Sequence, residues 1–168
     1  MVLAHNILLR YLNSIYLQAT GMSRSEDVGA FLFYCQAWCI IIHEHHHGEE
    51  ETFFPKIAEY TAKKDIMNTN LEQHKTFESG IQKFEKYVTE TPSNAYSGSM
   101  LRKLVDDFAP ALVQHLHAEI STLLSVGEKF GGEKLQKVYD EWEEKIKKES
   151  REKSDPVFLS FSSLLSVC

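Results

Sequence analysis

The sequence has few prolines and glycines and no excess of basic charge. Four prolines and eight glycines among 168 residues leave little room for the many turns of an all-β fold, so helices are favoured. The formal net charge of −6 argues against a nucleic-acid-binding protein, which needs a basic stripe to hold the phosphate backbone. The same acidic balance fits poorly with docking on an anionic membrane.

The sequence also lacks clear targeting and anchoring signals. His5, Asn6 and Arg10 interrupt the apolar N-terminal stretch, which argues against a signal-peptide core. No acidic residue precedes Glu26, so a mitochondrial presequence remains an alternative. The apolar tail 156–168 is too short to span a bilayer, and its terminal Cys168 is not placed for prenylation. We expect a cytoplasmic protein that binds neither membrane nor nucleic acid.

Cysteine is scarce, and common catalytic motifs are missing. Cys35 and Cys39 are four residues apart in a helical run and are predicted to be buried free thiols, which points weakly to a reducing compartment. There is no glycine-rich phosphate loop, no Gly-x-Ser-x-Gly elbow and no internal repeat of the solenoid kind. These absences leave the histidines and glutamates as the residues that could carry chemistry.

Helical periodicity appears in four long stretches. They cover about residues 2–19, 26–54, 70–88 and 99–126, and we predict an all-α fold, an antiparallel up-down four-helix bundle over residues 1–130. Ser23 and Glu26 have the spacing of a capping box that opens the second helix. Pro55 is expected to end or kink that helix near Phe54, and Pro110 to kink the fourth helix.

An additional helix is predicted after the bundle. Gly127 and Gly131–Gly132 are expected to break the chain before an amphipathic segment over residues 131–153 that packs on the bundle. Its apolar face consists of Leu135, Val138, Trp142 and Ile146. The tail 154–168 has no clear pattern and is left unassigned.

Each bundle helix places one histidine in register with its apolar stripe: His5, His45, His74 and His115. Two helices repeat the same spacing, which gives His45-x-x-x-Glu49 and His115-x-x-x-Glu119, and residues four apart lie on one helix face. One such histidine alone is more often an ordinary core residue. Four imidazoles and two carboxylates buried without partners would cost several kcal/mol each, however, and cations would remove that cost.

The mixture of donors limits the metal. Imidazole with carboxylate suits iron, zinc, manganese or copper, while calcium and magnesium prefer oxygen ligands. Six candidate ligands exceed the four of a structural zinc site. They suit two metals, with Glu49 and Glu119 as bridges and the histidines as terminal ligands.

The sequence resembles the hemerythrin-like (HHE cation-binding) family. The matching stretches are His5-Asn6, then His45-His46-His47-Gly48-Glu49-Glu50 before Phe54-Pro55, Glu72-Gln73-His74, and His115-Leu116-His117-Ala118-Glu119. The resemblance covers residues 1–130. It implies a di-iron centre whose ligand is dioxygen or a similar small diatomic molecule or peroxide. Oxygen-carrying hemerythrins have a further histidine where this chain has Glu78, so oxygen carriage is less secure than dimetal binding.

The register of the second helix stays open. His45/Glu49, His46/Glu50 and His47/Glu51 share the required spacing, and the distance to Phe54-Pro55 in the family favours the first pair. The surplus histidines are expected to be solvated or to support the ligands: His43, His46, His47 and His117. Glu50 could orient a ligating imidazole.

Three functional hypotheses follow. The first is a non-haem di-iron protein that binds dioxygen or a related molecule, or that senses or handles iron. The second is a di-iron oxidase or peroxidase with the same ligands, and the third is a regulatory module stabilised by metal. The protein partner, the oligomeric state and the metal itself stay open at this point.

Overall fold

The computed structural model describes residues 1–152, with side chains described to residue 148. This part is mostly helical, with short connecting segments, and contains no strand, which confirms the predicted all-α class. The α-helices are α1 (Val2–Gln18), α2 (Ser25–Gly48), α3 (Phe54–Thr61), α4 (Asn68–Glu90), α5 (Gly98–Phe130) and α6 (Gly132–Glu152). Short 3₁₀ turns lie at Ala19–Gly21 and Ser93–Ala95. The predicted tail 154–168 lies outside the described residues.

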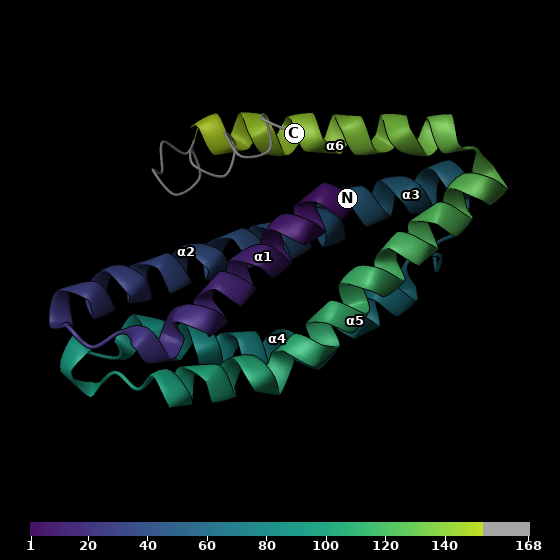
Figure 1. The fold of residues 1–168 in the computed structure, drawn as a ribbon. Coiled ribbons are helices and arrows are strands. Elements are labelled where there is room, and N and C mark those ends of the chain that lie inside the picture. The colour runs from purple at the N-terminus through teal and green to yellow at the C-terminus, as the bar shows by residue number, and fades with distance from the viewer. Residues whose placement is uncertain (153–168) are drawn as a thin grey trace.

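The bundle consists of α1, α2, α4 and α5. α4 packs against α5 and α2, and α1 packs against α2 and α5. The turns that join α1 to α2 and α4 to α5 lie at one end, and the N-terminus and α3 lie toward the other (Figure 1). α6 begins near the end of the bundle where α3 lies, runs back beside the bundle, and contacts α5 and α3 (Figure 1).

A main core of apolar side chains fills the half of the bundle near these turns. Trp38 is fully buried; its ring stacks on Phe108 at 5.7 Å and meets Phe84 edge-on at 5.8 Å. The Trp38 indole donates its N–H to the Leu8 carbonyl at 3.1 Å, so its polar atom is satisfied. A Cβ at Gly80 would lie 2.6 Å from the Phe108 Cβ, so glycine is needed where α4 and α5 pack this closely.

A second core joins α6 to the bundle. Trp142 stacks on Phe53 with ring centroids 4.9 Å apart, and its indole donates to the Gly48 carbonyl at 2.9 Å. All members of the predicted apolar face belong to this cluster: Leu135, Val138, Trp142 and Ile146. That prediction is confirmed.

One predicted helix cap and one predicted helix end are wrong. α2 begins at Ser25 with no side-chain cap, because Glu26 pairs with Arg24 at 3.1 Å instead of closing a capping box with Ser23. α5 runs through Gly127 and ends only before Gly131, whose φ is 108°. One interior glycine costs only about 1 kcal/mol, and packing of the neighbouring Val126 and Phe130 in the second core opposes that cost.

Two features of the long helices bear on other predictions. Pro110 lies inside α5, and α5 changes direction partway along its length (Figure 1), as a proline in a helix interior predicts. The stretch Ser25–Thr61 is apolar and long enough to cross a membrane by length and composition, and 50% of its apolar window is buried inside the bundle. Core helices of water-soluble proteins also have this composition, so the stretch is only weak evidence for a membrane-spanning helix.

Candidate metal centre

The end of α2 changes its hydrogen-bonding pattern where the predicted ligands lie. A π-helical segment spans Glu49–Phe53, and the Phe54 N–H bonds to the Glu49 carbonyl, five residues back. Pro55 then falls in the first turn of α3, where its missing N–H costs nothing. The expected kink near Phe54 is therefore replaced by a π segment that starts at Glu49.

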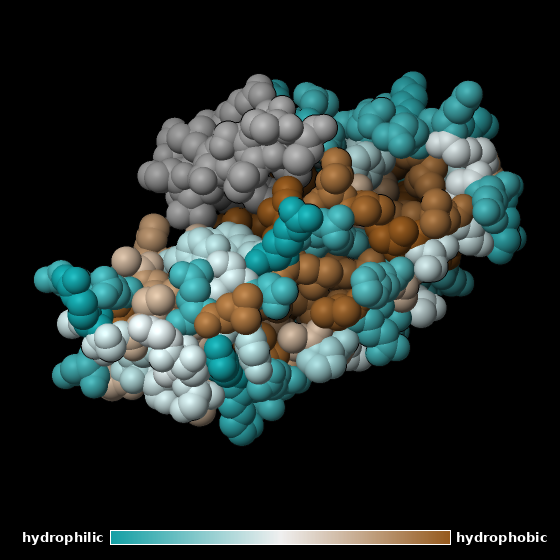
Figure 2. Space-filling model, viewed as in Figure 1, coloured by the Kyte–Doolittle hydropathy of each residue, from teal (hydrophilic) through white to brown (hydrophobic). Residues whose placement is uncertain are grey.

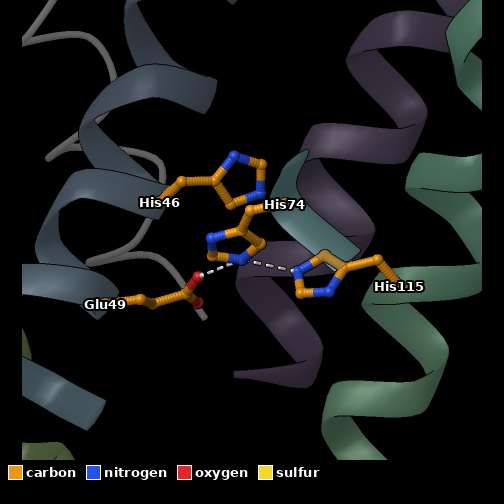
Figure 3. A group of neighbouring side chains, drawn as sticks. All are labelled: His46, Glu49, His74 and His115. Atoms are coloured by element: carbon orange, nitrogen blue, oxygen red, sulfur yellow. Dashed lines mark hydrogen bonds and ion pairs between the residues drawn. The ribbon is translucent and has the colours of Figure 1, made fainter. Parts of the chain in front are cut away.

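Seven side chains from four helices form two overlapping groups. In the first group, His46 of α2 and Glu49 of the π segment meet His74 of α4 and His115 of α5 (Figure 3). The second group contains His5 of α1, His45 of α2, Glu49 of the π segment and Glu119 of α5. Within each group the ligand atoms all lie within 4.8 Å of one another. Glu49 belongs to both groups and so lies between them.

These polar groups are buried without adequate partners. Glu49, Glu119 and His115 are 0% exposed. Among the atoms that lack a hydrogen-bond partner are the Nε2 atoms of His5, His45 and His46 and both carboxylate oxygens of Glu49 and Glu119. The His5 Nε2 lies 3.1 Å from Glu119 Oε2, and the His45 Nε2 lies 3.0 Å from Glu49 Oε1, but neither contact has the alignment of a hydrogen bond.

So many unpaired buried polar atoms at one place are rare in native proteins, where most such atoms are satisfied. Two cations would satisfy them together, and the imidazole and carboxylate donors are those that transition metals take. The residues therefore fit a two-metal centre.

Outer hydrogen bonds aim several imidazoles inward. The Nδ1 of His5 faces the Leu116 carbonyl at 3.0 Å, and that of His115 faces Gln73 Oε1 at 3.2 Å. The Nδ1 of His74 lies 2.5 Å from Glu50 Oε1. A proton on Nδ1 leaves the Nε2 lone pair free, as in metal sites where an outer acceptor fixes the tautomer. The Nε2 atoms of His74 and His115 lie 3.0 Å apart on the inner side.

Burial sets the charge of the metal-free centre. Burial, then the neighbouring imidazoles, holds the pKa of His45 and His46 well below the usual range and lowers that of His115 to about 3. These rings are therefore neutral, the form that binds metal. Burial, and next the charge of Glu119, raises the pKa of Glu49. A cation between the two carboxylates would oppose both effects.

The structure brings together all six predicted site residues: His5, His45, Glu49, His74, His115 and Glu119. It adds His46, for which a solvated or supporting role was expected. His45 and His46 precede Glu49 by four and three residues, and both spacings make helix neighbours. The two histidines therefore flank Glu49, and each faces a different group. These two spacings to Glu49 are the sequence feature that could have identified His46 as a second candidate ligand on this helix.

The other surplus residues lie elsewhere. Glu78 is exposed and accepts a hydrogen bond from Gln82 at 3.2 Å, so it does not join either group. His47 and His117 are exposed, and His43 lies 3.1 Å from Glu85 in a contact only part-buried. The third histidine of the first group thus comes from α2, not from the position of Glu78 on α4.

Comparison with known proteins agrees with this geometry. Residues 1–126 match the hemerythrin HHE cation-binding domain, and the chain belongs to that family. It is 37% identical over 142 residues to the dimeric xanthone biosynthesis cluster protein R11 of Cryptosporiopsis sp. (strain 8999). The match covers 84% of this chain and 54% of that protein, so the chain spans about half the length of this relative. No solved structure matches the chain.

Proposed function

We propose that this chain is a non-haem di-iron protein that binds dioxygen or a related small molecule. The observation that carries the proposal is the set of buried, unpaired donor atoms that converge from four helices. His46, His74 and His115 would hold one iron, and His5 and His45 the other. Glu49 and Glu119 would lie between the ions. Zinc and manganese accept the same donors and are the competing metals.

The chain's contribution is to hold, orient and enclose the ions. A pair of ferrous ions supplies the electrons for reversible or irreversible reaction with dioxygen. Phe77 shields the first group, with its ring 5.2 Å from His46 and 5.4 Å from His115. At the second group, the ring centroid of Trp142 lies 6.3 Å from that of His45. If Glu49 and Glu119 serve both ions, three histidines give the first ion five protein donors and two histidines give the second ion four. We therefore assign the small molecule to the second group.

A second candidate is a di-iron oxidase or peroxidase that uses the same ligands. The relative named for a xanthone biosynthesis cluster favours this candidate, because its name links it to the synthesis of a small molecule. Consumption of dioxygen or peroxide over many turnovers separates an oxidase or peroxidase from a carrier. Stoichiometric, reversible uptake favours the carrier.

We also propose a cytoplasmic location. Cys35 and Cys39 are buried and unpaired, which is consistent with a reducing compartment. The location of the tagged full chain in cells, by fluorescence microscopy, tests this proposal.

The deciding experiment measures bound metal and the absorption spectrum after anaerobic loading with ferrous iron and exposure to air. We expect two irons per chain, one for each group, and a spectrum that changes with dioxygen. His74→Ala should lose iron, because His74 belongs to the first group. His47→Ala is the matched control, because His47 is exposed outside both groups. A folded wild-type chain that takes up no iron contradicts the proposal.

A further inference from the structure

An apolar cavity lies between the start of α1, the second half of α5 and α6. Its volume is about 730 Å³, and apolar surface gathers between α6 and the helices below it (Figure 2). Leu3, Ala4, Phe53, Leu123, Leu124 and Tyr139 are among the lining residues. Cavities of about 300–1,000 Å³ with mainly apolar walls are typical of small-molecule sites.

The cavity adjoins the second metal group. Ala4 and Ile120 line it, and they are the chain neighbours of His5 and Glu119. Phe53 also lines it and ends the π segment that begins at Glu49. Burial, then the charges of Glu143, Glu49 and Glu119, raises the pKa of Tyr139, as expected if the cavity wall lies near both carboxylates. A molecule in the cavity would therefore lie beside the side of the centre that has fewer histidines.

The walls limit the chemistry of the occupant. Phe53 and Tyr139 both line the cavity and pack edge-on at 5.8 Å, so this part of the wall is aromatic and suits a flat ring system. The polar lining includes Gln136, Glu128 and Glu143, which can accept or donate hydrogen bonds but repel an anion. Three apolar side chains in the lining are strongly exposed, namely Val2 at 55%, Leu3 at 56% and Leu124 at 65%, as at a binding mouth.

We propose that this cavity binds a neutral, flat, mainly apolar aromatic molecule beside the His5–His45 side of the centre. One relative is named for a dimeric xanthone biosynthesis cluster, and xanthone itself is a flat, neutral, tricyclic aromatic ketone of this shape and polarity. The role of the bound molecule as a reaction partner rests on the proposed di-iron function, whereas its binding depends on the cavity alone.

The test uses the full chain, metal-free and iron-loaded, with unsubstituted xanthone as the probe in equilibrium dialysis. Leu124→Arg places a charge in the apolar lining, where the exposed side chain leaves the fold intact. It should weaken binding by roughly tenfold or more, because a charge opposes apolar burial. Leu17→Arg is the matched control, since Leu17 is 68% exposed and does not line the cavity. Iron content should stay the same in all three proteins.

The outcomes separate the two proposals. Absence of xanthone binding, or equal binding by wild type and Leu124→Arg, overturns the cavity proposal even when iron loading is normal. Failure to load iron with normal xanthone binding overturns the di-iron function and leaves the cavity proposal standing. A wild-type dimer that Leu124→Arg converts to a monomer, with no xanthone bound by either, would mean that the face joins two copies of the chain.

Discussion

Both halves of the bundle have buried interiors, but the side chains inside one half are apolar and those inside the other half are mainly polar. The main core around Trp38 is apolar, and the polar atom of Trp38 is bonded to Leu8. The half around Glu49 buries imidazoles and carboxylates, several of whose atoms have no partner. The first half satisfies every general expectation for a stable core. The second departs from those expectations, as functional sites commonly do.

The backbone shows the same contrast. α2 is a regular helix past Trp38 and becomes π-helical at Glu49. Departures of this kind inside helices are frequent at functional sites. One half therefore contributes stability, whereas the other half loses part of it by burying the unpaired donors of the candidate metal centre. Three substitutions and one labelling experiment test this difference between the two halves.

Removal of the shared ligand should have the largest effect on the metal half. Glu49→Ala takes a donor from both groups, so we expect it to lose both ions. Glu51→Ala is the matched control, because Glu51 is exposed two residues away. Metal analysis after gel filtration measures the result. Retention of both ions by Glu49→Ala would show that Glu49 is not the bridge.

Loss of His46 should affect one ion. His46→Ala removes a donor from the first group only, so we expect about one ion per chain to remain firmly bound. Glu78→Ala should bind metal like wild type, because Glu78 is exposed and bonded to Gln82. Competition with a coloured chelator resolves the two ions. Weaker binding in Glu78→Ala than in His46→Ala would reverse the assignment.

The apolar half should respond in stability and not in metal content. Trp38→Ala removes a fully buried indole and should lower the free energy of unfolding by about 3–5 kcal/mol. Phe33→Ala is the control, because Phe33 is 60% exposed and its loss should have little effect. Urea unfolding of the metal-free proteins gives the comparison. Trp38→Ala should still bind iron where it is folded, and loss of iron from the folded variant would show that the two halves are coupled.

The smallest effect concerns the thiols of the apolar half. Burial raises the pKa of Cys35 to about 12 and that of Cys39 further, so little thiolate is present at pH 8. We expect neither thiol to react with iodoacetamide in the native protein at that pH, and both to react in urea. Peptide mass spectrometry locates the label. Rapid native labelling of either thiol would show that this half opens to water.

Much of this architecture follows from periodicity in the sequence. The apolar stripes predict the bundle helices, and the in-register histidines predict which side chains meet in the core. The ligand role of these residues stays a prediction, although the structure brings all six together. The apolar face of α6 is equally predictable, because Leu135, Val138, Trp142 and Ile146 recur at helical spacing.

The remaining features depend on competition that the local sequence does not reveal. Ser23 and Glu26 have capping-box spacing, but Arg24 takes the Glu26 carboxylate. Gly127 looks like a helix end, but tertiary packing continues α5 past it. The three registers of the His-His-His run are exclusive alternatives in the sequence analysis, each with one ligand histidine, whereas the rings of both His45 and His46 lie beside Glu49. The π segment begins at Glu49, directly after Gly48, and the Gly48 carbonyl accepts a hydrogen bond from Trp142 of α6. This contact joins residues far apart in the sequence, so local patterns do not predict it.

The π segment has a consequence at the level of the gene. A π turn holds one residue more than the α turn it replaces, so it is equivalent to a single-codon insertion into a straight helix. Deletion of one codon within residues 50–53 would restore an α-helix. The wide turn takes up the extra residue locally, so after that deletion α3 would keep its orientation relative to His45 and His46. Loss of a residue from the regular part of α2 would instead rotate the rest of the helix by about 100°. The π segment is therefore the part of this long helix that is expected to tolerate a one-codon deletion best, for example at the exposed Glu51.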